Sequence, residues 1–296
     1  MTHLVSPSNY KGISWFIAHC LLFTLISLIT KHLLGHLHLF EIVFFQTALG
    51  TLFIFPFVYS KLSLNDLNIF KWSKFISHGL RSFLWLSATI IFFSSINKVG
   101  LSKSIAISFT VPIFTTILAV LFLKERLYLK RFLALFIGLL GMYVIVEPGT
   151  SGYQIEAYVI ILASFIWSIT DIMIKIMGRK VAAKHNTFYF TLFSFLFMTP
   201  IVIFYWKMPY NDEWFWLLAL GGLFVLNMIS VTRSYQYADL TILMPFVFIQ
   251  LVFVSIAAYF IFGEVIKEST IFGASLIILG TSYIAYSEKQ SKNKKK

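Results

Sequence analysis

The sequence predicts an all-α polytopic membrane protein with ten transmembrane helices, arranged as two inverted five-helix repeats. Hydrophobic residues make up 58% of the 296 residues and charged residues only 12%, whereas a soluble domain is about a quarter charged. The mean hydropathy is +0.83. The apolar residues fall in runs of about twenty, the length that an α-helix needs to cross a hydrocarbon core. Short stretches of the two halves can also be aligned with each other.

Ten apolar runs are separated by short polar segments, several of which contain proline or glycine, as in "VEPGTSG" (146–152). Each run is long enough to form one membrane-spanning helix. The expected helices cover residues 12–34, 40–60, 76–97, 101–123, 130–147, 154–177, 186–206, 213–235, 240–263 and 269–286.

The distribution of Lys and Arg predicts the orientation of the chain. If the N-terminus is inside, the inner segments hold sixteen of the 24 Lys and Arg residues, the outer loops hold four, and the other four lie within helices or at their ends. Such an excess of cations on one side follows the positive-inside rule. We therefore expect both termini in the cytoplasm. The same placement explains the net charge of +12 without a nucleic-acid partner. The basic tail "SEKQSKNKKK" is most simply a solvated cytoplasmic end, and contact with anionic membrane lipid is the alternative.

The two halves of the chain align at two offsets. At an offset of 139 residues, "TTILAVLFLKE" (115–125) lies over "VSIAAYFIFGE" (254–264). At an offset of 144, three polar residues of the first helix lie over three of the sixth: Thr24 over Ser168, Ser27 over Asp171, and Lys31 over Lys175. Because each half has five helices, the second half must be inverted. The expected repeats are residues 1–150 and residues 151–296 with the basic tail, an arrangement typical of secondary transporters.

Polar side chains form a stripe on each of these two helices. Ser164, Ser168, Asp171 and Lys175 recur at a spacing that places them on one helix face. Two such stripes on repeat-related helices predict a shared aqueous cavity, with Asp171 facing it. The alternatives are that Asp171 and Lys175 pair with each other along the helix, or that Lys175 reaches the cytoplasmic interface.

Several motifs resemble the drug/metabolite transporter superfamily, and specifically its EamA-type members. The segment "VPIFTTILAVLFLKE" runs from Pro112 to Glu125, and Glu264 ends the ninth expected helix in the same way, although Leu251 stands where a matching proline is expected and the nearest proline is Pro245. We expect both glutamates to pair with loop cations. "HLFEIVFFQTALG" and "AAYFIFGEVIKESTIFGASLIILGTSYIAYSEK" are similar to S-adenosylmethionine uptake transporters of obligate intracellular bacteria.

This resemblance implies a carrier in the bacterial inner membrane that moves a small polar metabolite by alternating access. It implies no ATP hydrolysis, no enzymatic activity and no cofactor, and the sequence has no phosphate-binding loop of the G-x-x-x-x-G-K-[ST] kind. S-adenosylmethionine uptake is the most specific reading. The export of amino acids or other metabolites is the alternative within the superfamily, and a receptor or scaffold is the alternative outside it.

The candidate substrate-binding residues follow from the chemistry of such a substrate. Arg81 could hold a carboxylate with its two-pronged guanidinium group, or could anchor the helix at the interface. Trp85 or Trp167 could stack on an adenine or face a sulfonium, or could simply pack. Asp171 would offset positive charge.

Four further polar residues are candidates for the same site. Asn227 and Gln250 lie near the middle of their helices, where each needs a partner from the substrate or from another helix. Ser168 and Ser27 belong to the two stripes. We expect no metal site, because one cysteine excludes a Cys-based cage and the spacing of the histidines in "KHLLGHLHLFE" (31–41) matches no established site.

Overall fold

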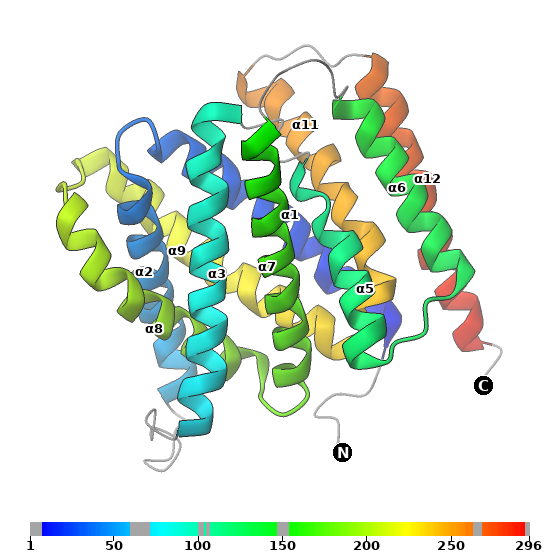
Figure 1. Ribbon diagram of the computed structural model, residues 1–296, viewed down its shortest axis with the longest axis horizontal. Coiled ribbons are helices and arrows are strands. Elements are labelled where there is room, and N and C mark those ends of the chain that lie inside the picture. Colours follow the sequence, from blue (N-terminus) through cyan, green and yellow to red (C-terminus); the bar gives the residue numbers. More distant parts are fainter. Residues whose placement is uncertain are drawn as a thin grey trace.

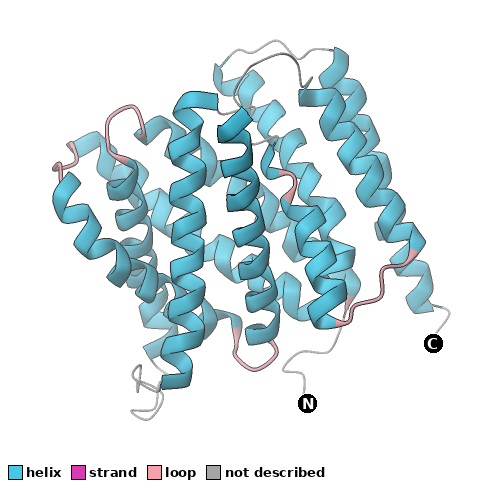
Figure 2. Cartoon of the chain, in the orientation of Figure 1, coloured by secondary structure: helices cyan, strands magenta, loops and turns pink. Residues whose placement is uncertain are grey.

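Helices form almost all of the chain that the structure describes. The computed structural model describes residues 8–59, 72–99, 104, 107–146, 154–262 and 268–293, and within these ranges there is no strand (Figures 1 and 2). The elements are α1 (Asn9–Leu33), α2 (Leu39–Tyr59), α3 (Trp72–Val99), α5 (Val111–Leu123), α6 (Leu129–Val146), α7 (Gln154–Gly178), α8 (Ala183–Val202), η1 (Ile203–Tyr205), α9 (Asn211–Tyr237), α10 (Leu240–Leu243), η2 (Met244–Phe248), α11 (Ile249–Phe262) and α12 (Glu268–Asn293).

Seven helical segments of the described chain are long and apolar enough to cross a membrane. Two shorter apolar helices, Val111–Leu123 and Ile271–Tyr283, add to them. The prediction of an all-α polytopic membrane protein is therefore confirmed. The total of ten spans and the inverted arrangement of the halves stay predictions.

The segment expected as one helix over 240–263 is interrupted. α10 ends at Leu243, a 3₁₀ segment that contains Pro245 follows, and α11 begins at Ile249. Proline has no N–H group, so inside an α-helix it removes one hydrogen bond and its ring kinks or breaks the helix. The break therefore lies at Pro245. Leu251, the position at which the family pattern has a proline, lies inside α11.

The segment expected as one helix over 101–123 is also irregular. Within the described residues, Phe109 and Thr110 form a turn in which the Thr110 amide donates to the Ile107 carbonyl at 3.1 Å, and α5 begins at Val111. At the offset of 139, residues 107–110 correspond to 246–249. The turn at 109–110 and the 3₁₀ segment at 244–248 thus overlap at one aligned pair, Phe109 and Phe248, and the repeat stays a prediction. Discontinuous helices at matching positions are a feature of transporter binding sites.

α9 lies at the centre of the packing. It contacts α1 and α2, while α3 packs on α7 and α8, and α5 packs on α7. α6 and α12 run side by side at one edge of the molecule, at the right of Figure 1, with η2 against both. The largest buried apolar cluster includes Phe16, Phe190, Phe224 and Phe246, so it joins α1, α8, α9 and η2.

Glu125 connects the end of α5 to the start of α10. Lys124, with a φ of 56°, turns the chain at the end of α5. The Glu125 carboxylate then accepts the amide of Leu240 at 3.0 Å and the amide of Thr241 at 2.9 Å. Amides at a helix N-terminus have no partner within the helix and favour a carboxylate. The expected pairing of Glu125 with loop cations is therefore wrong, and Glu264 lies outside the described residues.

Two adjacent glycines of α9 provide a matched test of helix packing. A Cβ atom on Gly221 would lie 2.6 Å from the Leu49 Cβ of α2, whereas one on Gly222 would lie 3.9 Å from the Phe53 ring. We expect Gly221→Ala to lower the free energy of unfolding by about 1–3 kcal/mol, because α2 and α9 must move apart. Gly222→Ala should leave the melting temperature in detergent unchanged or slightly raised. Equal melting temperatures for the two variants would contradict this packing.

Candidate functional site

The Asp171 carboxylate is held inside the bundle by two hydroxyl groups from other helices. Tyr235 of α9 donates its hydroxyl to Asp171 Oδ1 at 2.9 Å, and Thr115 of α5 donates its hydroxyl to Oδ2 at 3.2 Å. Tyr235 is buried, with 2% of its surface exposed, and its ring stacks on Phe16 of α1 with the centroids 6.1 Å apart. Asp171 therefore joins α5, α7 and α9, and its negative charge meets neutral donors.

Lys175 lies one turn from Asp171 and does not pair with it. Its ammonium group donates to the backbone carbonyls of Tyr235 at 2.6 Å and of Ala238 at 2.5 Å. Only 7% of Lys175 is exposed, so the side chain does not extend to the interface. Both alternatives considered for Lys175, pairing with Asp171 and snorkelling, are therefore wrong. A cation suits this place, because the last carbonyls of a helix lack partners and carry partial negative charge.

Arg81 of α3 is the second buried charge of this region. It is 1% exposed, so the alternative of an interfacial anchor is wrong. Its guanidinium donates from Nη1 to Asn186 Oδ1 at 2.8 Å and lies over the Phe190 ring, 4.2 Å from the centroid. The Arg81 charge attracts that of Asp171, but no direct ion pair joins these two described residues. Arg81 Nε and Asn186 Nδ2 are buried without a hydrogen-bond partner.

The two candidate tryptophans lie in different surroundings. Trp85, one turn from Arg81, packs edge-on against the same Phe190 ring with the centroids 5.3 Å apart, and also contacts Phe224. Trp167 packs against Phe92 at 5.1 Å in a separate apolar cluster of α3 and α7. Its indole N–H is buried without a partner. Trp85 thus belongs with Arg81, whereas Trp167 does not share its contacts.

Of the two central amides, Asn227 bonds to α1, and Gln250 lies half-buried in the first turn of α11. Asn227 Oδ1 lies 2.5 Å from His19 Nδ1, and Asn227 is 1% exposed. The Cys20 thiol of α1 donates to the Phe246 carbonyl of η2 at 3.6 Å, one turn before Gln250. Asn227 therefore connects α1 to the second half of the chain, as interhelical hydrogen bonds do in membrane proteins.

The two candidate serines bond to their own helices. Ser27 donates to the Phe23 carbonyl at 2.8 Å, and Ser168 donates to the Phe165 carbonyl at 2.6 Å. The polar stripes of α1 and α7 do not pack against each other. Each helix instead packs on α9.

Sequence reasoning missed four residues that complete this site: Tyr235, Thr115, Asn186 and His19. Tyr235 lies in "SYQYAD" near the expected end of its helix, where a tyrosine is typical of the membrane interface. Thr115 lies within the segment that aligns the two halves, and no local signal distinguishes it or Asn186. A histidine inside a membrane helix is a recognisable signal, and His19 could have been found by it.

At the other end of the bundle, polar side chains bond to backbone amides or pack against aromatic rings. The buried Glu41 carboxylate accepts the His38 amide at 3.0 Å and the Lys207 amide. The His38 ring stacks on Tyr205 at 4.4 Å, and His32 lies against Trp216 at 5.2 Å.

A transporter-family model and several curated transporters match most of the chain. The model of the EamA-like transporter family matches residues 10–147 and 154–286. The chain is 30% identical to an S-adenosylmethionine uptake transporter of Rickettsia prowazekii, with 96% of each chain covered. It is 26% identical to a pseudopaline exporter of Pseudomonas aeruginosa, with 90% of this chain and 93% of the exporter covered. It is 25% identical to a riboflavin transporter of Vibrio cholerae, with 74% and 71% covered.

One solved crystal structure has the same fold. Its TM-score is 0.80 at 15% sequence identity, and the match covers 96% of this chain and 99% of that one.

Proposed function

Because this chain belongs to the EamA-like transporter family, we propose that it imports S-adenosylmethionine, moving it by alternating access as a secondary transporter. The similarity to S-adenosylmethionine uptake transporters of Rickettsia over 96% of the chain supports this substrate. We place the protein in the bacterial inner membrane with both termini in the cytoplasm. The halves 1–150 and 151–296 would form the two inverted repeats around the site.

The observation that carries the proposal is the Asp171 carboxylate, held in the interior by two neutral hydroxyls and by no direct ion pair among the described residues. A buried charge is costly, so an intramembrane carboxylate that is not neutralised by a partner indicates a functional site. S-adenosylmethionine carries a sulfonium and an ammonium group. Either can be attracted by Asp171.

Arg81 and Trp85 supply the remaining chemistry of the proposed substrate. The Arg81 guanidinium has a buried Nε without a partner, next to the unpartnered Asn186 amide, and both can donate to the methionyl carboxylate. Trp85 shares the Phe190 ring with Arg81 and can stack on the adenine. We assign secondary places to Trp167, Asn227, Gln250, Ser168 and Ser27.

The exporter of pseudopaline among the relatives supports a second candidate function. In that case the same residues would serve the export of an amino-acid-like metabolite, which also carries carboxylate and ammonium groups. The direction of transport distinguishes the two functions.

Uptake of radiolabelled S-adenosylmethionine into cells that express the chain tests the proposal. We expect saturable uptake that an excess of unlabelled S-adenosylmethionine abolishes. S-adenosylhomocysteine, which lacks only the methyl group and the sulfonium charge, should compete less well, because a direct charge contact to Asp171 is worth about tenfold in affinity. Methionine, which lacks the adenosine, should compete weakest.

The absence of uptake in cells where the protein is present in the membrane would contradict the proposal. Faster loss of preloaded amino acids from the same cells would then support the exporter instead.

A further inference from the structure

Two residues of α7 form hydrogen bonds with Tyr235, one with its side-chain hydroxyl and one with its backbone carbonyl. Its hydroxyl donates to Asp171 at 2.9 Å, and its backbone carbonyl accepts a hydrogen bond from Lys175 at 2.6 Å. Asp171 and Lys175 lie one turn apart on the same face of α7. Asp171 and Lys175 thus bind one tyrosine, the first through its side chain and the second through its main chain.

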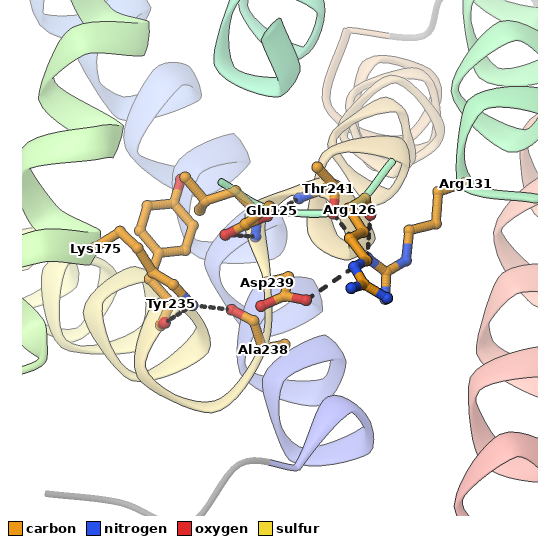
Figure 3. A network of polar contacts seen from close by, with 9 residues as sticks. Glu125, Arg126, Arg131, Lys175, Tyr235, Ala238, Asp239 and Thr241 are labelled. Carbon is orange, nitrogen blue, oxygen red and sulfur yellow. Dashed lines mark hydrogen bonds and ion pairs between the residues drawn. The ribbon is translucent and has the colours of Figure 1, made fainter. Parts of the chain in front are cut away.

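The residues that follow Tyr235 enter a cluster of charged and polar groups, which we call the link cluster: Glu125, Arg131, Asp239 and Thr241. Arg131 Nη1 donates to the Thr241 hydroxyl at 2.9 Å and to the Arg126 carbonyl at 3.0 Å, and lies 3.6 Å from the Asp239 carboxylate. Glu125 accepts the amides of Leu240 and Thr241. Figure 3 shows these groups converging on the chain between α9 and α10.

The connection from Tyr235 to the link cluster is short and bonded along its length. Lys175 also binds Ala238, three residues further on, and its ammonium attracts the carboxylates of Glu125 and Asp239. Gln236 donates to the carbonyls of Gly178 at 2.8 Å and of Val181 at 3.0 Å. Ala238 itself is buried against Gly12 of α1. The chain from Tyr235 to Ala238 is thus tied to α7 and α1 by contacts that a displacement of Tyr235 would strain.

The link cluster joins elements at the end of the bundle where α1 begins and α12 ends in Figure 1. It ties the α5–α6 connection to the chain between α9 and α10. Opening that end of the bundle requires these bonds to loosen.

We propose that Tyr235 is a positioning residue that couples the Asp171 site to the link cluster. This inference rests on the proposed function. A substrate cation that approaches Asp171 competes with the Tyr235 hydroxyl for Oδ1, because both seek the same carboxylate oxygen. When the hydroxyl is displaced, the only remaining hydrogen bond from α7 to Tyr235 among those described is the one from Lys175 to its backbone carbonyl. The hydrogen bonds of Leu240 and Thr241 to Glu125 and Arg131 then weaken.

Tyr235→Phe removes the hydroxyl and keeps the ring that stacks on Phe16. Tyr237→Phe is the matched control, because Tyr237 lies two residues away on the same helix and its ring contacts Lys11, 5.8 Å from the centroid. Without any ligand, amide hydrogen exchange in lipid nanodiscs should be about tenfold faster at Leu240 and Thr241 in Tyr235→Phe, since a hydrogen bond to a charged group is lost. Tyr237→Phe should match the wild-type protein.

The same variants separate binding from transport. With S-adenosylmethionine as the probe, Tyr235→Phe should bind several-fold more tightly, because the substrate no longer displaces a hydroxyl, while its maximal uptake rate falls about tenfold. A purely structural role would weaken binding and uptake together.

The hydrogen-exchange result bears on the coupling independently of the substrate. Exchange at Leu240 and Thr241 that is the same in Tyr235→Phe and Tyr237→Phe would overturn the coupling, whatever the substrate is. Faster exchange in Tyr235→Phe, in a protein that neither binds nor imports S-adenosylmethionine, would support the coupling and refute only the proposed substrate.

Discussion

Replacement of Asp171 by Asn is expected to reduce the uptake of S-adenosylmethionine, measured as Vmax/Km, by at least about thirtyfold, because truncating one side of a buried charge contact costs about 2 kcal/mol or more. The asparagine side chain has nearly the same shape and keeps an oxygen that can accept the hydroxyls of Tyr235 or Thr115. The loss should therefore come from the missing charge and not from unfolding. Radiolabelled uptake and the melting temperature of the purified variant measure the two effects separately.

Asp212→Asn provides the control for Asp171→Asn. Asp212 lies exposed in the first turn of α9, far in sequence from the buried charges, and its replacement should leave uptake unchanged. If Asp171→Asn, expressed at the normal level, imports S-adenosylmethionine at the wild-type rate, Asp171 is not part of the substrate site.

Replacement of Arg81 by Met is expected to affect both stability and uptake. The variant loses the bond to Asn186 and the contact with the Phe190 ring, and leaves the Asn186 oxygen buried without its donor. We expect the free energy of unfolding to fall by about 3 kcal/mol. Uptake should fall below detection, because the substrate carboxylate would then have no cation. The melting temperature in detergent and radiolabelled uptake measure these effects.

Arg81→Lys distinguishes the roles of the guanidinium. Lysine keeps the charge but cannot bond in two directions from a planar group, so it should restore part of the stability and little of the uptake. Arg233→Met is the control, because Arg233 also lies over an aromatic ring, that of Trp15 at 6.0 Å, but is only half-buried. It should cost about 0.5 kcal/mol. If Arg81→Lys imports at the wild-type rate, the two-pronged contact with a carboxylate is wrong.

The predicted helices depended on local features of the chain and agree with the structure at most ends. The expected spans at 12–34, 40–60 and 213–235 fall within a few residues of α1, α2 and α9. The span at 240–263 was expected as one helix although it contains Pro245, because a proline within an apolar run does not by itself show whether the helix breaks there or continues, as α2 does at Pro56. The 3₁₀ segment around Pro245 packs against α6 and α12, which are distant in sequence.

The candidate site could be predicted only in part. A helical spacing placed Asp171 on an inner face of its helix, and its carboxylate indeed bonds to α5 and α9. The same reasoning gave, as an alternative, a pair between Asp171 and Lys175, which is its nearest opposite charge along the chain. In the structure Lys175 bonds instead to carbonyls 60 and 63 residues away.

The sequence by itself determined that this protein is a helical membrane protein and which charges lie within its spans, because hydropathy, length and helical period act over neighbouring residues. Only the tertiary structure decided that Tyr235 lies between Asp171 and Lys175, and that Arg81 meets Asn186 and Phe190. Such pairings depend on the axial position and rotation of each helix relative to its neighbours. Those are set by the packing of whole helix faces, as where Gly221 of α9 lies against α2, and no single segment of the chain encodes them.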